Sequence, residues 1–170
     1  VNIDGNGLTV TSKDATINSV SIGKGANSVA NNTVLGESAL DAAVTGGSNT
    51  AIGSTALTTN TSGNHNVAVG KGSLYANTTG SANTAVGALA LDATTTGSSN
   101  TAVGYSSLTT NTTGTQNTGF GRNTLHDNST ANDNTAVGYD AMNANTTGAE
   151  QVAVGSIALD ANTTGSFNTA

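Results

Sequence analysis

Residues 66–87 read N-V-A-V-G-K-G-S-L-Y-A-N-T-T-G-S-A-N-T-A-V-G, and this stretch decides the fold. It begins and ends on one motif, Asn-x-Ala-Val-Gly, whose two copies start at Asn66 and Asn83. A fixed period of this length is typical of a solenoid, in which each repeat forms one coil and stacks on the next. The structure of the whole chain can therefore be derived from the structure of one 17-residue coil.

The period continues to the end of the sequence in several columns of equivalent residues. The first glycine column is Gly36, Gly53, Gly70, Gly87, Gly104, Gly121, Gly138 and Gly155. The asparagine column is Asn49, Asn66, Asn83, Asn100, Asn117, Asn134 and Asn168, with Gln151 as its one replacement. A leucine, or Met142 in one copy, stands four residues after each glycine of the first column.

Local chemistry favours strands and turns over helices in each copy. Gly occurs about twice per repeat and Thr-Thr pairs recur, and both disfavour a helix interior. The Thr-Ala-Val pieces alternate as short strands do. We therefore predict an all-β fold, a parallel β-roll (β-solenoid) of about eight 17-residue coils. Each coil would have two short strands, one at Thr-Ala-Val and one around Gly-x-x-x-Leu.

The columns also predict which side chains face inward. We expect the leucines and the large residue before each first-column glycine, such as Val86, to fill the core. The alanine of Thr-Ala-Val, such as Ala85, is small enough for close approach at an outer interface. For the asparagine column two interpretations stay open: a ladder of amides between coils, or tolerance of turn dihedral angles.

Composition indicates that one chain has a thin core. Val, Ile, Leu and Phe make up about 18% of the residues, a fraction that by itself is typical of disorder. Burying the two large side chains of a coil stabilises the fold by less free energy than ordering the 17 residues of that coil costs. We therefore predict a homo-oligomer.

The sequence divides into three parts. Residues 1–18 are expected to form a hairpin or cap, because apolar and polar residues alternate there around a turn at Asp4-Gly5-Asn6-Gly7. Residues 19–35 are expected to form a shorter, 13-residue coil with strand character at residues 27–30. Residues 36–170 form the 17-residue-repeat roll.

Charge and residue usage exclude several classes of function. Four Lys and Arg against ten Asp and Glu, a net charge of -6, do not suit nucleic acid or an anionic membrane. There is no run of 18 apolar residues to insert into a membrane, and no Cys to supply thiolate ligands. We predict no cofactor and no metal, with a calcium site at Asp127, Asp133 and Asp140 as a minor alternative.

Nothing in the repeat predicts catalysis. His65 and His126 occupy two variable columns and are expected in exposed loops, without the partners of a catalytic triad. Asp41, Asp92 and Asp160 share a column, but they lie too far apart along the roll for a glycosidase pair. We expect no catalytic residues.

A surface strip is the best candidate for binding. Tyr105 and Tyr139 share the column that follows the first glycine, and Arg122 lies between them. One above another, these three side chains would form a strip about 10 Å long that could contact a sugar or a protein.

Several stretches of the sequence resemble known fibre proteins. Ser19-Val20-Ser21-Ile22-Gly23 and the repeated Asn-Thr-Ala-Val-Gly resemble head repeats of YadA-like trimeric autotransporter adhesins. Residues 138–148 are similar to repeats of phage tail-fibre and other surface-fibre proteins. The resemblance implies a left-handed β-roll, a homotrimer of side-by-side chains, a non-enzymatic role in attachment, and an extracellular location on a cell surface or virion tail.

The resemblance has limits that leave the host open. A typical adhesin head repeat is shorter than these coils, and the heptad stalk of an autotransporter is missing from this sequence. Bacterial adhesin and phage fibre therefore both stay open.

The expected function is that of a structural or adhesive segment of an extracellular fibre, which binds a surface receptor or glycan or presents a binding tip. One alternative is a pure shaft or spacer. Another is an ice-binding solenoid that uses the threonine column of the turns: Thr61, Thr78, Thr95, Thr112, Thr146 and Thr163.

Overall fold

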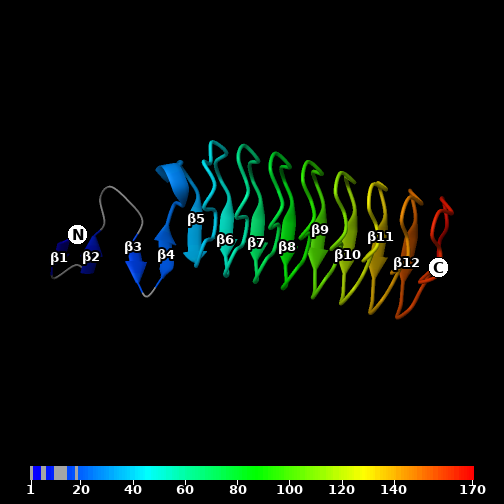
Figure 1. Ribbon diagram of the computed structural model, residues 1–170. Coiled ribbons are helices and arrows are strands. Elements are labelled where there is room, and N and C mark those ends of the chain that lie inside the picture. The colour runs from blue at the N-terminus through cyan, green and yellow to red at the C-terminus, as the bar shows by residue number, and fades with distance from the viewer. Residues whose placement is uncertain (1, 5–6, 10–14, 18) are drawn as a thin grey trace.

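The computed structural model shows an elongated stack of coils and describes residues 2–4, 7–9, 15–17 and 19–170 (Figure 1). Two short strands, β1 (Asn2–Asp4) and β2 (Gly7–Thr9), pair antiparallel at the N-terminal end. The other strands form one ten-stranded sheet that runs the length of the stack. It begins with β3 (Ala15–Ile17) and β4 (Val20–Gly23), followed by a 3-10 turn, η1 (Ala26–Ser28).

From β5 onward every pair of neighbouring strands is parallel, and each residue pairs with its equivalent one repeat away, as Thr84 does with Thr101. The strands are β5 (Thr33–Gly36), β6 (Thr50–Ile52), β7 (Val67–Val69), β8 (Thr84–Val86), β9 (Thr101–Val103), β10 (Thr118–Phe120), β11 (Thr135–Val137) and β12 (Val152–Val154). The predicted all-β solenoid with 17-residue coils is therefore confirmed. Its handedness stays a prediction.

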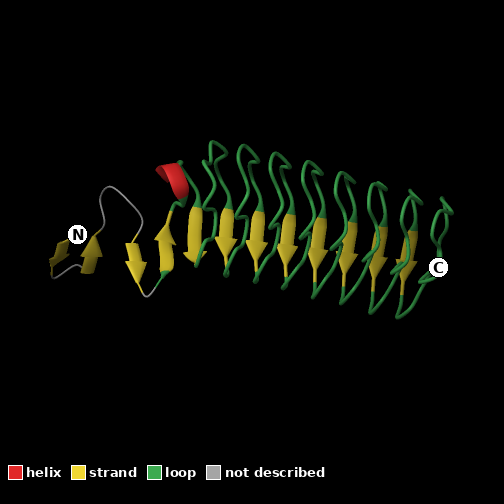
Figure 2. Cartoon of the chain, viewed as in Figure 1, coloured by secondary structure: helices red, strands yellow, loops and turns green. Residues whose placement is uncertain are grey.

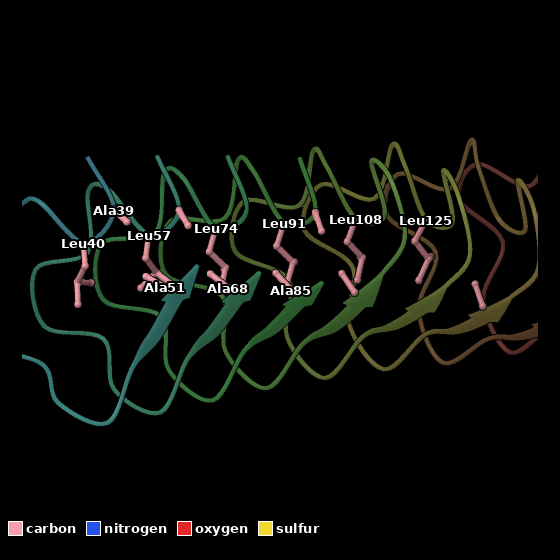
Figure 3. Close-up of a cluster of buried hydrophobic side chains, with 14 of the residues drawn as sticks. Ala39, Leu40, Ala51, Leu57, Ala68, Leu74, Ala85, Leu91, Leu108 and Leu125 are labelled. Atoms are coloured by element: carbon pink, nitrogen blue, oxygen red, sulfur yellow. The ribbon is translucent and has the colours of Figure 1, made fainter. Parts of the chain in front are cut away.

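The prediction of which strand residues face the core is wrong. The central alanine of each strand, such as Ala68 or Ala85, is fully buried. The valine after it points outward, and Val86 is 36% exposed. Figure 3 shows these alanines opposite the buried leucines. The physical reason is space: with one leucine and several amides already inside, a coil has room on this side for only a methyl group.

Gly119 shows how tightly this interior is packed. It takes the alanine position in β10, and a Cβ there would lie 2.5 Å from the Ser107 hydroxyl and 2.8 Å from that of Thr124. Thr124 stands where most other coils have Ala or Ser, and its hydroxyl lies 2.7 Å from that of Ser107. The larger side chain of Thr124 is thus accommodated because Gly119, which lies opposite it in the core, has no side chain.

The second strand expected around Gly-x-x-x-Leu is absent from the described coils, and a turn takes its place (Figure 2). The leucines of the column from Leu40 to Leu125 are buried as predicted, and Leu159 in the last coil is partly buried. Even so, Leu74 has φ 50 and Leu91 has φ 52. The residue two before Leu91, Leu89, also has positive φ. These left-handed residues bend the chain around the core. Each costs about 1–2 kcal/mol, which burial of the leucine side chain offsets.

Backbone hydrogen bonds join successive coils outside the sheet as well. The Leu74 amide donates to the Ala90 carbonyl at 3.0 Å, and the Thr78 amide donates to the Thr95 carbonyl at 2.9 Å. Turn residues therefore stack coil on coil, as the strands do. This explains how a coil with only three strand residues can stay regular.

The asparagine column forms a buried ladder, which decides between its two interpretations. The backbone amide of Asn66 donates to Oδ1 of Asn49 at 2.9 Å, and its Nδ2 donates to the Gly80 carbonyl of the next coil at 2.8 Å. The left-handed residue is the one before it, His65. Asparagine is needed here for its amide, since the side chain bonds to the backbone of the next coil while the residue's own N–H donates to the side chain of the coil before.

The sequence-based interpretation missed a second amide ladder, because it assigned Asn-Thr-Thr-Gly to turn chemistry. Nδ2 of Asn77 donates to Oδ1 of Asn60 at 2.9 Å, and the same contact joins Asn145 to Asn128 at 2.9 Å. Gln151 reaches from the first ladder to the second, donating to Oδ1 of Asn145 at 3.0 Å. Both ladders are buried polar networks that fix the register between coils.

Thr94 interrupts the second ladder, and this gives a stability prediction. Oδ1 of Asn77 is buried and has no hydrogen-bond partner, because Thr94 stands where an asparagine would donate to it. Replacing Thr94 with asparagine should raise the free energy of unfolding by about 1–2 kcal/mol, as a buried orphan acceptor gains a donor. Urea denaturation measures this. Thr94→Asp introduces the shape of asparagine without the donor and should destabilise; equal stability of both variants would contradict the ladder argument.

The N-terminal part differs from the expectation of a 13-residue coil at residues 19–35. β4 pairs antiparallel with β5, with Ile22 opposite Leu35, so the chain reverses here instead of completing a coil. Residues 26–28, which overlap the piece expected to have strand character, form η1. The repeated Val-x-Ile-Gly and Val-Leu-Gly sequences share strand propensity, but propensity does not specify strand direction. The turn predicted after Asp4 lies partly outside the described residues.

Candidate binding surface

The outer face of the parallel sheet is an uncharged, largely apolar surface, called here the sheet face. It is built from the first and third residues of each strand, whose side chains point away from the core. The first residues are Thr33, Thr50, Val67, Thr84, Thr101, Thr118, Thr135 and Val152. The third residues are Leu35, Ile52, Val69, Val86, Val103, Phe120, Val137 and Val154. None of these side chains carries a charge, although the chain has a net charge of -6.

Several side chains of the sheet face are strongly exposed. Phe120 is 55% exposed and Val154 is 61% exposed. Contiguous apolar surface of this kind on a regular sheet is typical of an interaction site. The sequence-based interpretation placed these residues in the core, so it missed the surface.

The predicted strip comes together beside the sheet face. Cζ of Arg122 lies 5.9 Å from the ring centroid of Tyr105 and 5.6 Å from that of Tyr139, so the guanidinium lies between two aromatic rings. Nη1 of Arg122 also donates to the Tyr139 hydroxyl at 3.4 Å. Each cation–ring contact contributes about 0.5–1 kcal/mol at an exposed site. The arrangement holds an otherwise flexible arginine in one place.

Inter-coil hydrogen bonds fix the backbone of this strip. The Asn123 amide donates to the Tyr105 carbonyl at 3.0 Å, and the Asp140 amide donates to the Arg122 carbonyl at 3.0 Å. The three side chains therefore leave the solenoid at a spacing of about 4.8 Å per coil. Tyr105 is 51% exposed and Tyr139 is 46% exposed, so the strip is open to solvent.

Electrostatically, the strip is positive. Within the part of the chain that the structure describes, no carboxylate lies within ion-pair distance of Arg122. From Ser54 to Ser156 the column of the strip contains no acidic residue, and it also carries Lys71, which is exposed. Two of the four basic residues of the chain thus lie in one column.

The histidines and acids do not form a catalytic or metal-binding cluster in the described coils. His65 is exposed, and Nδ1 of His126 lies 2.7 Å from Oδ1 of its neighbour Asp127. Burial raises the pKa of the Asp92 carboxyl. Residues 19–170 contain no group of three His, Asp or Glu side chains arranged as metal ligands, so Asp127, Asp133 and Asp140 do not come together as one site.

The turn threonines considered for ice binding take part in coil stacking. The Thr78 hydroxyl donates to the Thr95 carbonyl at 3.0 Å, and the Thr95 hydroxyl donates to the Thr112 carbonyl at 3.2 Å. Their hydroxyl protons therefore point along the stack. This column has a structural role in the protein.

Comparisons with known proteins find nothing similar to this chain. A search of family models, of curated proteins and of solved structures gives no significant match. Among the described residues, no helix has the length and apolar character needed to cross a bilayer.

Proposed function

We propose that this chain is a homotrimeric β-roll segment of an extracellular fibre, with a non-enzymatic role in attachment at a cell surface or virion tail. The observation that carries the proposal is the sheet face, an uncharged, largely apolar surface that extends over every coil from β5 to β12. An isolated chain would leave this surface in water. Packing against other copies of the same chain would bury it and supplement the thin core.

The geometry of the solenoid supports a fibre. The coils stack in one direction, so the first and last described strands lie at opposite ends of the molecule (Figure 1). A chain of this form extends along one axis and presents the same surface on each successive coil. The resemblance of Asn-Thr-Ala-Val-Gly to adhesin head repeats supports the threefold assembly and the adhesive role.

The Tyr–Arg–Tyr strip favours adhesion over a pure spacer. A spacer needs only regular coils, whereas Tyr105, Arg122 and Tyr139 form an exposed cluster that the stacking does not require. Tyr and Arg are among the residues most enriched at energetically important contacts.

Adhesion can be measured directly with the 170-residue chain. We expect the purified, fluorescently labelled chain to bind a panel of bacterial and eukaryotic cells saturably, with unlabelled chain competing for the same sites. Matched protein heated until unfolded serves as the control. Absence of saturable binding across the panel would favour the spacer.

A further inference from the structure

We infer that the column containing Lys71, Tyr105, Arg122 and Tyr139 binds a linear acidic polysaccharide lying along the axis of the solenoid. This inference rests on the proposed adhesive function, which it makes specific. The ligand class follows from three features of the column: an immobilised cation, flanking aromatic rings, and a regular axial spacing.

The cation selects for negative charge. Arg122 is held between two rings and, within residues 19–170, has no carboxylate partner. Its only hydrogen bond to a side chain there is the 3.4 Å contact with the Tyr139 hydroxyl, so most of its donors stay available. A planar guanidinium pairs well with carboxylate and sulfate groups. Because the Arg122 side chain is already ordered in the free protein, binding a ligand costs less conformational entropy.

The rings and hydroxyls select for sugar. Tyr105 and Tyr139 present half-exposed rings with phenolic hydroxyls on either side of the guanidinium. Aromatic side chains of this kind combine an apolar body with a polar tip. A pyranose ring has the complementary chemistry, with apolar C–H faces and hydroxyl edges. The coil spacing of about 4.8 Å is comparable with the size of one sugar ring.

The axial direction selects for a polymer. Lys71 lies three coils from Arg122, about 14 Å away along the stack, and only Ala88 and Tyr105 intervene in the column. A single small anion cannot reach both cations, whereas a linear polyanion can. Nucleic acid fits poorly, because two cations on a chain of net charge -6 cannot neutralise a closely spaced phosphate backbone.

The test compares charged and neutral polymers on the intact chain. Polygalacturonate carries carboxylates, dextran sulfate carries sulfates, and dextran is neutral. Immobilised on a biosensor, one or both acidic polymers should bind the chain, while dextran should not. Raising the salt concentration from about 0.05 to about 0.5 M should weaken the binding, because exposed charges are screened.

Two variants locate the site. Arg122→Gln keeps a side chain with amide donors but loses the charge, and it should weaken binding at least tenfold. Lys71→Gln should weaken it about threefold for a long polymer and leave binding of a short fragment unchanged. Thr96→Glu changes the net charge by the same amount as Arg122→Gln, at an exposed turn away from the column, and should bind within twofold of wild type.

The outcomes separate this inference from the proposed function. Failure of both acidic polymers to bind, equal binding of dextran, or full binding by Arg122→Gln would each overturn the inference. Cell adhesion without binding to either acidic polymer would leave the adhesive function standing and overturn only the ligand class. Light scattering on Arg122→Gln should give the wild-type mass; a changed mass together with lost binding would assign the strip to assembly and overturn the inference.

Discussion

Replacing Gly87 with alanine is expected to lower the free energy of unfolding by about 3 kcal/mol or more. Gly87 has φ 136, a region that side-chain-bearing residues rarely enter. An added Cβ would also collide with the Gly104 carbonyl oxygen of the next coil, well inside the 3.0 Å that real Cβ contacts keep. Since that oxygen belongs to the backbone, relief requires the two coils to separate.

Gly72 supplies the matched control for this experiment. It also has positive φ, 66, but the atom nearest to an added Cβ would be a flexible leucine methyl of Leu89, at 3.2 Å. Other coils have Asn123 or Asp140 at the equivalent position with φ 53. Gly72→Asn should therefore change the free energy of unfolding by less than about 1 kcal/mol.

Urea denaturation followed by far-ultraviolet circular dichroism measures both variants. Coils contact only their neighbours, so unfolding of Gly87→Ala should begin at the middle of the stack and broaden the transition. A loss in Gly87→Ala no larger than that in Gly72→Asn would contradict both the backbone strain and the collision between coils that are argued for Gly87.

The period was enough to predict the fold and the site geometry along the axis. A constant 17-residue offset places equivalent side chains one above another, so the approach of Arg122 to two tyrosine rings follows from three positions in one column. The same argument predicts a buried leucine column, because one large side chain recurs at a constant place. The lateral arrangement within a coil and the antiparallel pairing of β4 with β5 required the structure.

Alternation along a strand could not show which face is inside. Thr84, Ala85 and Val86 alternate equally well with either face buried, and the usual preference for burying valine favoured the wrong choice. The deciding quantity is the volume inside a coil, where a leucine and two amide ladders leave room for a methyl group alone. Gly119 beside Thr124 was the available signal, since a smaller residue in one column accompanies a larger one in another.

The second strand was predicted wrongly for a related reason. Leu74 and its equivalents lie in left-handed conformation, which sequence propensity assigns to Gly and Asn. The conformational free energy that the left-handed turn costs is offset because the turn points the Leu74 side chain into the core, where it is fully buried. Tertiary packing thus overrides local preference at every coil.

Val86→Lys should convert the protein from an oligomer to a monomer. Val86 lies at the middle of the sheet face, with Val69 and Val103 beside it in the neighbouring strands. In a trimer formed through this face, three ammonium groups would be buried near one axis. Burial of an unpaired charge costs several kcal/mol per ion, and like charges repel one another.

The variant should still fold as a monomer, because Val86 is already partly exposed in the single chain. Light scattering should give three times 16.4 kDa for the wild type and 16.4 kDa for Val86→Lys, with similar circular dichroism. Thr79→Lys places the same charge in an exposed turn of the same coil and should stay trimeric. A trimeric Val86→Lys would exclude the sheet face as the interface, and a monomeric wild type would overturn the proposed assembly, because the apolar face would then be stable in water.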